Sequence, residues 1–405
     1  MKIVIVHNAY QLRGGEDRVY ETERDLLRAH GHEIIEYHRS NREIERYSLF
    51  DRVMLGPRTV WSAASKREFA DLLRRVKPDL VHIHNTFVVI SPSIYSACRE
   101  QGVPVVQTLH NYRMLCPAGA SFRDGQVCHD CDTHLAYGVL RGCHRNSRTG
   151  TAAVAAMLAW HRFAGTYSTQ VDRYIALSEF ARSRFLAGGF EPDKVVVKPN
   201  CVYPDPGERS GDGSYALFVG RLGTEKGVKT LLAAWQKLGK DVALVVAGTG
   251  ALENEVRDAT AGMPAVKYLG EIPSGELFEV MKRARFVVLP SICYENFPVT
   301  AVEAYACGVP VVASDLGAMK EIVIHGRTGL LFRPGDADDL AAKVSFAWTN
   351  SGYLAGLGRS ARQEYELKYT SERNHAALIE IYRSVLPKCA RALVFSGSLA
   401  QRVQG

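Results

Sequence analysis

Short apolar runs alternate with amphipathic stretches along most of this chain. Runs of about four to eight apolar residues are typical of strands buried in a parallel sheet. Between the first two runs, Val19, Leu26 and Leu27 fall on one face of an expected helix. The sequence therefore predicts strands and helices in alternation, with helices covering a parallel sheet. In the first half, the expected strands are residues 2–7, 33–38, 79–84, 103–109, 173–177 and 194–198.

The pattern restarts after a break. Residues 203–214 are crowded with proline, glycine and acidic residues, which is typical of a linker. We therefore predict an α/β protein with two parallel-sheet domains, residues 1–202 and 203–370, that face each other across a cleft. Residues 371–405 are expected to form a terminal helix that packs back on the first domain, followed by a tail. The second set of expected strands is 215–219, 242–247, 265–269, 285–289, 309–313 and 329–332.

Charge and hydropathy narrow the class of protein. The 405 residues carry a net charge of +7, and nearly all of the excess lies in residues 1–200. A solvated surface accounts for this charge, and so does attraction to an anionic membrane or a lipid diphosphate. No basic run is interleaved with aromatic residues, so nucleic acid is not an expected partner. Because no signal-peptide pattern and no run of about 20 apolar residues occurs, we expect a cytoplasmic protein, either soluble or peripheral at the inner membrane face.

A glycine-rich turn with two cations follows the first expected strand of the second domain. Residues 220–227 carry Arg221 and Lys226 among three glycines. Glycines let a ligand approach the backbone, and a guanidinium with an ammonium neutralises a diphosphate. The turn lacks the Gly-Lys-Ser/Thr ending of a Walker loop. The alternative is that both cations are ordinary surface residues.

A second polar loop leads into a helix that is expected to be buried. Pro298 suits the first turn of a helix, and small apolar residues follow it. The free N–H groups of residues 296–300 would form a seat for a diphosphate. Glu295 would lie beside a sugar on that diphosphate, whereas Glu303, inside the helix, would need hydroxyl partners such as those of a ribose. A structural role for Glu303 is the alternative.

Four cysteines cluster in an expected insertion at residues 113–150. They are spaced C-x11-C-x2-C-x11-C, and the central C-x2-C is typical of a knuckle that holds one metal ion. We predict a structural zinc site, which would supply folding energy to a segment with little core of its own. Disulfides, an iron–sulfur cluster and free thiols are the alternatives. The predicted ligands are Cys116, Cys128, Cys131 and Cys143.

Glu295 and Glu303, with seven residues between them, resemble the E-x7-E motif of retaining glycosyltransferases of family 4. Residues 304–331 are similar to the rest of that block, and residues 220–227 are similar to the family's diphosphate clamp. The resemblance covers most of residues 1–385 and is more specific in the second half. It implies a GT-B fold, in which two Rossmann-like domains face each other across a cleft.

The resemblance also implies roles for individual residues. Arg221 and Lys226 would stabilise the departing diphosphate, Glu295 would bind the donor sugar, and Glu303 would hold the ribose. Gly15, after the first strand, would face the phosphates. The other implied donor-binding residues are Thr249 and Gly250 in a loop facing the cleft, Ile272 near the base, and Asn296, Phe297, Pro298, Val299 and Thr300 along the phosphates and sugar.

Two positions depart from the family's pattern. Pro298 stands where many relatives have glycine, and proline has no N–H to donate to a phosphate. Asn111 stands where the family has aspartate beside a histidine, so a carboxylate is lost there. His110 remains a candidate to hydrogen-bond the sugar or the acceptor, and a structural role is the alternative.

The resemblance implies transfer of a sugar from a UDP- or GDP-linked donor, with retention of configuration and without a catalytic metal. The catalytic candidates are Glu295, Arg221, Lys226 and His110. The implied acceptor is a polysaccharide, a lipopolysaccharide or a lipid-linked glycan. A nucleotide-sugar epimerase on the same fold is the alternative, and a zinc-containing nucleic-acid-binding protein is a rival from another class.

Overall fold

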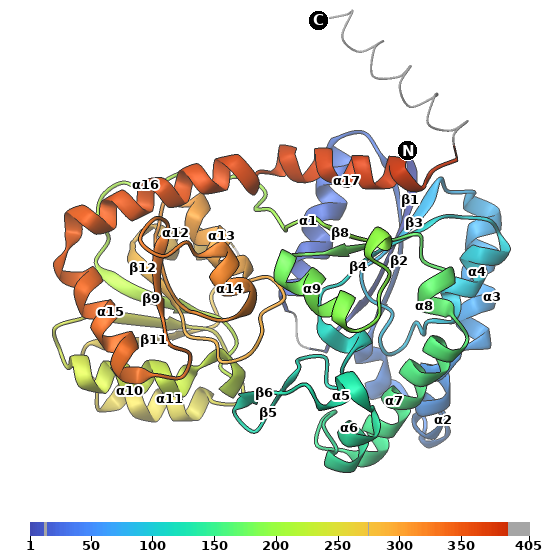
Figure 1. Ribbon diagram of the computed structural model, residues 1–405, viewed down its shortest axis with the longest axis horizontal. Coiled ribbons are helices and arrows are strands. Elements are labelled where there is room, and N and C mark those ends of the chain that lie inside the picture. Colours follow the sequence, from blue (N-terminus) through green and yellow to red (C-terminus); the bar gives the residue numbers. More distant parts are fainter. Residues whose placement is uncertain (12–13, 274, 388–405) are drawn as a thin grey trace, which may run out of the picture.

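The computed structural model describes residues 1–11, 14–273 and 275–387, and the tail predicted at 388–405 lies outside them. The chain forms two lobes, each built on a six-stranded parallel sheet (Figure 1). This arrangement confirms the predicted α/β class. No helix in the described part of the chain is both long and apolar enough to cross a bilayer.

The sheet of the first lobe has the strand order β2-β1-β3-β4-β7-β8. Its inner strands are mostly apolar, and the Ile3–Val6 side chains are fully buried. The strands are β1 (Lys2–Ala9), β2 (Glu33–Ser40), β3 (Leu80–Ile83), β4 (Val105–Thr108), β7 (Arg173–Ala176) and β8 (Val195–Val197). The helices of this lobe are α1 (Gly15–Ala29), α2 (Leu49–Val60), α3 (Ala63–Val76), α4 (Ser93–Glu100), α7 (Arg148–Phe163), α8 (Thr166–Thr169) and α9 (Glu179–Ala187), with 3-10 turns η1 (Asn41–Arg46) and η3 (Pro192–Lys194).

The segment predicted as an insertion forms small elements at the lower edge of the first lobe (Figure 1). Ion pairs hold it: Asp130 pairs with Arg141, and Asp132 lies 2.6 Å from Arg184 of α9. Its elements are η2 (Tyr112–Met114), the antiparallel hairpin of β5 (Phe122–Arg123) and β6 (Gln126–Val127), α5 (Asp130–Thr133) and α6 (Ala136–Arg141).

The sheet of the second lobe has the strand order β11-β10-β9-β12-β13-β14. Its strands are β9 (Tyr215–Val219), β10 (Leu244–Ala247), β11 (Val266–Gly270), β12 (Ala284–Leu289), β13 (Val311–Ser314) and β14 (Gly329–Phe332). Its helices are α10 (Val228–Leu238), α11 (Glu253–Ala261), α12 (Leu277–Lys282), α13 (Val299–Ala306), α14 (Gly317–Ile322), α15 (Ala337–Thr349) and α16 (Ser351–Lys368), with the 3-10 turn η4 (Thr224–Lys226) after β9.

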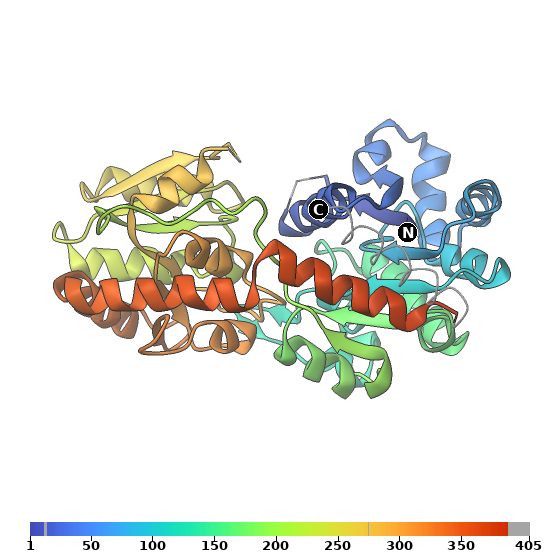
Figure 2. The same cartoon turned by 90° about the horizontal axis from the view of Figure 1, so that it is seen from above.

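The last helix crosses from the second lobe to the first. α17 (Ser371–Val385) continues the line of α16 over both lobes, as Figures 1 and 2 show. The Tyr382 hydroxyl on α17 lies 2.8 Å from the Nδ1 atom of His82 on β3, and Asn374 lies 3.2 Å from the Lys198 ammonium after β8. The terminal helix is therefore tied to the sheet of the first lobe.

The strand order explains where a site forms. In each sheet the winding reverses beside the first strand, between β1 and β3 in one lobe and between β9 and β12 in the other. Ligands of open parallel sheets bind at such points, beyond the carboxyl ends of the strands. The loops after β9 and β12 carry Lys226 and Glu295, and the loops after β1 and β3 carry Gly15 and His84.

Candidate active site

Lys226 and Glu295 form an ion pair at the reversal point of the second sheet. The Lys226 Nζ and Glu295 Oε1 atoms are 2.6 Å apart, and the Ser291 hydroxyl donates to the same oxygen at 2.6 Å. Burial acts to raise the pKa of Glu295, but the Lys226 ammonium and the Ser291 hydroxyl outweigh it, so this pKa lies below its usual value. The site thus holds a charged carboxylate beside a charged ammonium.

A close backbone approach places this pair. Gly227 has a φ of +70°, and a Cβ atom at this position would lie 1.8 Å from the Pro290 carbonyl oxygen. The Ile292 amide also donates to the Glu225 carbonyl at 2.9 Å. Glycine at position 227 is therefore needed to bring the turn after β9 against the loop after β12.

Arg221 lies on the same turn and points outward. Its guanidinium donates to the Glu225 carboxylate at 2.6 Å, and its side chain is 66% exposed. Glu225 thus holds Arg221 at the rim of the site. No contact joins Arg221 to Glu295 in the part of the chain that the structure describes.

The start of α13 offers backbone donors beside Glu295. The amides of Asn296, Phe297 and Thr300 have no hydrogen-bond acceptor among the described residues. The Val299 amide donates to the Phe297 carbonyl at 3.0 Å. The prediction of a free N–H at Val299 is therefore wrong, because a local turn already uses this group. Pro298 is the N-cap residue, and the Phe297 side chain packs in the core.

Glu303 is almost fully buried and meets the first lobe. Its Oε1 atom accepts a hydrogen bond from the Arg18 guanidinium on α1, and its Oε2 atom is buried without a partner. Because Gly15 begins the same helix, the start of α1 faces α13. A Cβ atom on Gly15 would have open space around it, so this glycine borders a gap.

Three further predicted donor residues lie on neighbouring loops. Thr249 and Gly250 follow β10, and the Thr249 carbonyl accepts from the Leu222 amide at 2.8 Å. This loop therefore packs directly against the turn that carries Arg221. Ile272 follows β11 at the edge of the sheet and is half-buried.

His110 and Asn111 lie at the end of β4, next to the second lobe. The side-chain amide of Asn296 donates to the Leu109 carbonyl, and the Ser178 hydroxyl donates to the Asn296 backbone carbonyl at 3.1 Å. His110 is half-buried, and burial holds its pKa well below the usual value. His110, which follows Leu109, is therefore a neutral imidazole at the junction of the lobes.

A carboxyl group that motif reasoning missed lies beside Asn111. Glu16, in the first turn of α1, accepts from the Asn111 amide at 3.1 Å, and its other oxygen is buried without a partner. Burial and the neighbouring Asp17 raise the pKa of Glu16 to about 8. The sequence signal for Glu16 was a Gly-Gly-Glu turn that opens a helix. The same helix carries Arg18, three residues after Gly15.

The four cysteines of the expected zinc site are not gathered into a metal-binding group. Cys116 and Cys131 share a hydrogen bond, but no three of the four thiols lie within 4.8 Å of one another in the described structure. A tetrahedral zinc site needs four thiolates at about 2.3 Å from one ion. The structure therefore does not support structural zinc, and it records all four cysteines as free thiols. The ion pairs of Asp130 and Asp132 hold this segment instead.

The chain matches two family models, described as Glycosyltransferase Family 4 over residues 12–205 and Glycosyl transferases group 1 over residues 213–350. A glycosyltransferase of Methanocaldococcus jannaschii, named as uncharacterised, is 30% identical over 185 residues, which are 44% of this chain and 47% of that protein. A glycogen synthase of Mycobacterium tuberculosis is 33% identical over 172 residues, which are 41% of each chain. The matches thus span less than half the length of these curated relatives.

The fold is also that of solved glycosyltransferase structures. The crystal structure of HepE from Anabaena in complex with UDP-glucose has a TM-score of 0.68 and 17% identity, and covers 95% of this chain and 100% of that one. The two family models leave only a short linker between them, where the structure passes from one lobe to the other. The chain is a member of glycosyltransferase family 4, with a GT-B fold.

Proposed function

We propose that the protein is a retaining glycosyltransferase that moves a sugar from a nucleoside-diphosphate donor to a glycan or lipid-linked acceptor. The observation that carries the proposal is the Lys226–Glu295 pair beside the unoccupied amides of α13, opposite the start of α1. This arrangement offers cationic and N–H donors to a diphosphate and a carboxylate to the sugar next to it. The related HepE was solved with UDP-glucose, which makes a UDP-sugar the first donor to test.

The donor would displace interactions that the residues of the site make with one another. Lys226 would turn from Glu295 to the diphosphate, leaving Glu295 to accept from sugar hydroxyls. Arg221 would leave Glu225 and add a second cation. Glu303 already has one unpartnered buried oxygen, and a ribose hydroxyl would satisfy it.

The leaving group gains negative charge as the bond to the sugar breaks. Lys226, Arg221 and the N-terminus of α13 supply positive charge where it develops, so we propose catalysis without a divalent cation. In that scheme, chelating agents leave the rate unchanged. Loss of transfer in EDTA, with recovery on adding a metal, would contradict this part of the proposal.

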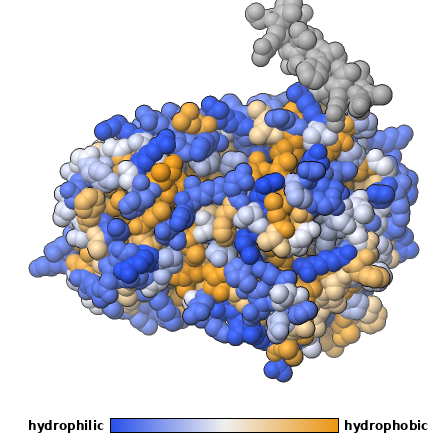
Figure 3. Space-filling model, viewed as in Figure 1, coloured by the Kyte–Doolittle hydropathy of each residue, from blue (hydrophilic) through white to orange (hydrophobic). Residues whose placement is uncertain are grey.

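The acceptor would enter from the first lobe, where Glu16, Asn111 and His110 line the junction. We propose that this lobe also docks on an anionic membrane surface. Leu49, Phe50 and Val53 on α2 are 83%, 68% and 75% exposed. α2 packs against α7, which exposes Trp160 and Phe163, and Figure 3 shows apolar surface over α6 and α7 at the lower edge of this lobe.

Product analysis tests the reaction. The protein is incubated with UDP- and GDP-linked sugars, with and without glycan and lipid-linked acceptors, and the products are separated by mass and by anomeric configuration. Transfer with retention supports the proposal. Epimerised donor without an acceptor would instead support the nucleotide-sugar epimerase, and no turnover with any donor would overturn both.

Vesicle flotation tests the docking surface. Replacing Leu49, Phe50 and Val53 together by serine should abolish binding to anionic vesicles, because it removes the apolar side chains that would enter the interface. Leu367→Ser is the matched control, since Leu367 is 54% exposed on α16 of the other lobe. Equal flotation of the triple variant and the unaltered protein would contradict membrane docking by this surface.

A further inference from the structure

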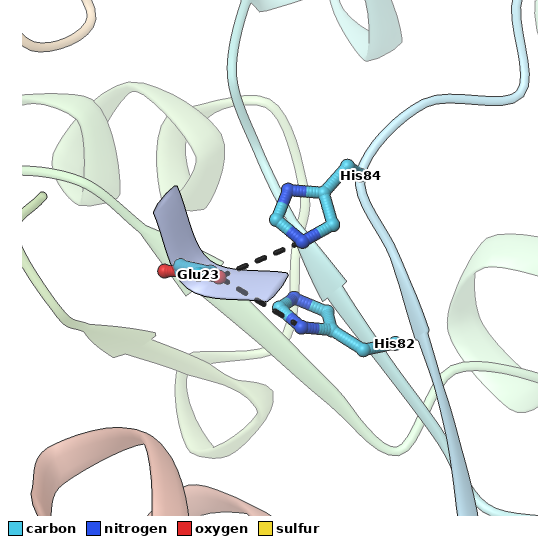
Figure 4. Close-up of side chains that lie close together, drawn as sticks. All are labelled: Glu23, His82 and His84. Carbon is cyan, nitrogen blue, oxygen red and sulfur yellow. Dashed lines mark ion pairs between the residues drawn. The ribbon is translucent and has the colours of Figure 1, made fainter. Parts of the chain in front are cut away.

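A cluster of buried polar side chains lies behind the junction of the lobes. Glu23 of α1 and His82 and His84 at the end of β3 point toward one another (Figure 4). The Glu23 Oε2 atom is 3.5 Å from His84 Nε2 and 3.9 Å from His82 Nδ1. All three side chains are at least 97% buried.

The partners of this cluster argue against a metal ion, although three ligand atoms lie within 4.8 Å of one another. The Lys198 ammonium, itself fully buried, is 2.5 Å from Glu23 Oε1 and already supplies the positive charge. The Tyr382 hydroxyl occupies His82 Nδ1 at 2.8 Å. A cation would have to be placed beside an ammonium and displace that hydroxyl, at a large cost in desolvation and repulsion.

A line of close contacts leads instead from Glu23 through His84 to His110. The Glu23 Oε2 and His84 Nε2 atoms face each other at 3.5 Å, and neither makes a hydrogen bond within the described residues. The Nδ1 atom of His84 lies 2.9 Å from the Nε2 atom of His110, and the two rings are stacked. Burial lowers the pKa of both histidines well below the usual value, so each ring is neutral and carries one proton. In such a chain, the position of the proton on one ring determines the position of the proton on the next ring.

The direction of the chain follows from Glu23. The Glu23 carboxylate would repel a lone pair on the facing Nε2 atom of His84, so we infer that this atom carries that ring's proton. The Nδ1 atom of His84 is then a lone pair, and His110 must donate its Nε2–H to it. His110 is left with a lone pair on Nδ1, since its hydrogen bond to His84 uses Nε2.

We propose that Glu23 and His84 are positioning residues that fix His110 as the Nε2–H tautomer and so present its Nδ1 atom as a hydrogen-bond acceptor. The substrate group that such an atom takes is a hydroxyl, whereas an anionic phosphate or carboxylate would be repelled by the lone pair. Whether that hydroxyl belongs to the donor sugar or to the acceptor rests on the proposed function. The tautomer of His110 does not rest on it.

His82 belongs to a separate branch of the cluster. Its Nδ1 atom lies 2.8 Å from the Tyr382 hydroxyl, and its Nε2 atom lies 2.8 Å from the Thr108 hydroxyl. This branch ties α17 to the sheet and does not touch His110. It therefore provides a control at equal depth in the same cluster.

Nitrogen-15 NMR of histidine-labelled protein tests the tautomer directly. Two-bond proton–nitrogen correlations identify the protonated ring nitrogen, and the His110→Gln variant assigns the signals. We expect His110 to carry its proton on Nε2 in the unaltered protein, between pH 6 and 8. An Nδ1–H tautomer, or an equal mixture, would overturn the proposal whether or not the protein transfers sugar.

Kinetics of two variants test the consequence. His84→Gln should lose the tautomer preference of His110 and lower kcat about tenfold or more, a typical effect for residues that orient a ligand-binding histidine. Its donor KM should change less than kcat. Tyr382→Phe removes a hydroxyl from the other branch and should keep both the tautomer and kcat within twofold. Equal losses in the two variants would show that the cluster acts only through stability.

Discussion

At the scale of single residues, the proposed reaction depends most on Lys226 and Glu295. Among the described residues each forms its ion pair with the other, and the two come from different loops of the same sheet. Their charges are set by one another and by Ser291, which makes the pair sensitive to single replacements.

Lys226→Met is expected to lower kcat about 100- to 1,000-fold, the usual effect of removing one donor to a developing charge. Steady-state transfer assays measure this. Lys229→Met is the matched control, because Lys229 is 65% exposed on the next helix and pairs with Glu255 rather than with a residue of the site. A Lys226→Met variant within threefold of the unaltered rate would remove Lys226 from the mechanism.

Glu16 should make stability depend on pH. Its pKa rises from 4.5 in the unfolded chain to about 8 in the folded one, so the folded state prefers the neutral carboxyl. Its contribution to stability is fully present below about pH 4.5 and is lost as the pH rises through 8. Glu16→Gln should therefore match the unaltered protein near pH 4.5 and be more stable at pH 8–9. Melting temperatures across this range check it, and a constant difference at every pH would contradict it.

At the scale of elements, three separate segments meet at Lys198. This residue follows β8, pairs with Glu23 on α1 and contacts Asn374 on α17, so its ammonium joins the first and last helices of the described chain. The pair is fully buried, which makes each charge costly without the other.

Lys198→Met should destabilise the protein by about 3–5 kcal/mol, because it leaves the Glu23 carboxylate buried without its partner. Adding Glu23→Gln should recover part of that loss. Equilibrium urea unfolding of the single and double variants gives the coupling between the two positions. Strictly additive losses would show that the two charges do not depend on each other.

The sequence predicted the elements and loops better than the contacts between lobes. The turn with Lys226 and the loop with Glu295 both follow apolar strands, so their meeting at one edge could be foreseen. Arg18 lies against Glu303 only because of how the two lobes face each other, whereas Glu16 meets Asn111 where two segments of the first lobe come together. The cysteine spacing predicted a zinc site that the structure does not support. The spacing also carries no information about the ion pairs that acidic residues of the same segment form with arginines.

At the scale of the whole molecule, contacts from the second lobe complete elements of the first. The Glu321 carboxylate on α14 accepts from the Glu179 and Phe180 amides at 3.0 and 2.9 Å. These amides belong to the first turn of α9, so one lobe caps a helix of the other.

Glu321→Ala should loosen the contact between lobes, since it leaves the two amides without this acceptor and removes about 1 kcal/mol of capping. Small-angle scattering should then show a larger radius of gyration without donor. Asp336→Ala is the control: it removes the cap of α15 inside the second lobe and should lower the melting temperature without changing the radius. An unchanged radius for Glu321→Ala would show that other contacts alone keep the lobes together.

The chain passes between the lobes twice, and the two passages touch. The Val202 amide donates to the Tyr369 carbonyl at 3.4 Å, and Arg362 pairs with Asp205 at 2.7 Å close by. Two adjacent connections permit rotation about the line that joins them but resist sliding or twisting. Any opening of the two lobes thus reduces to a swing about a single axis.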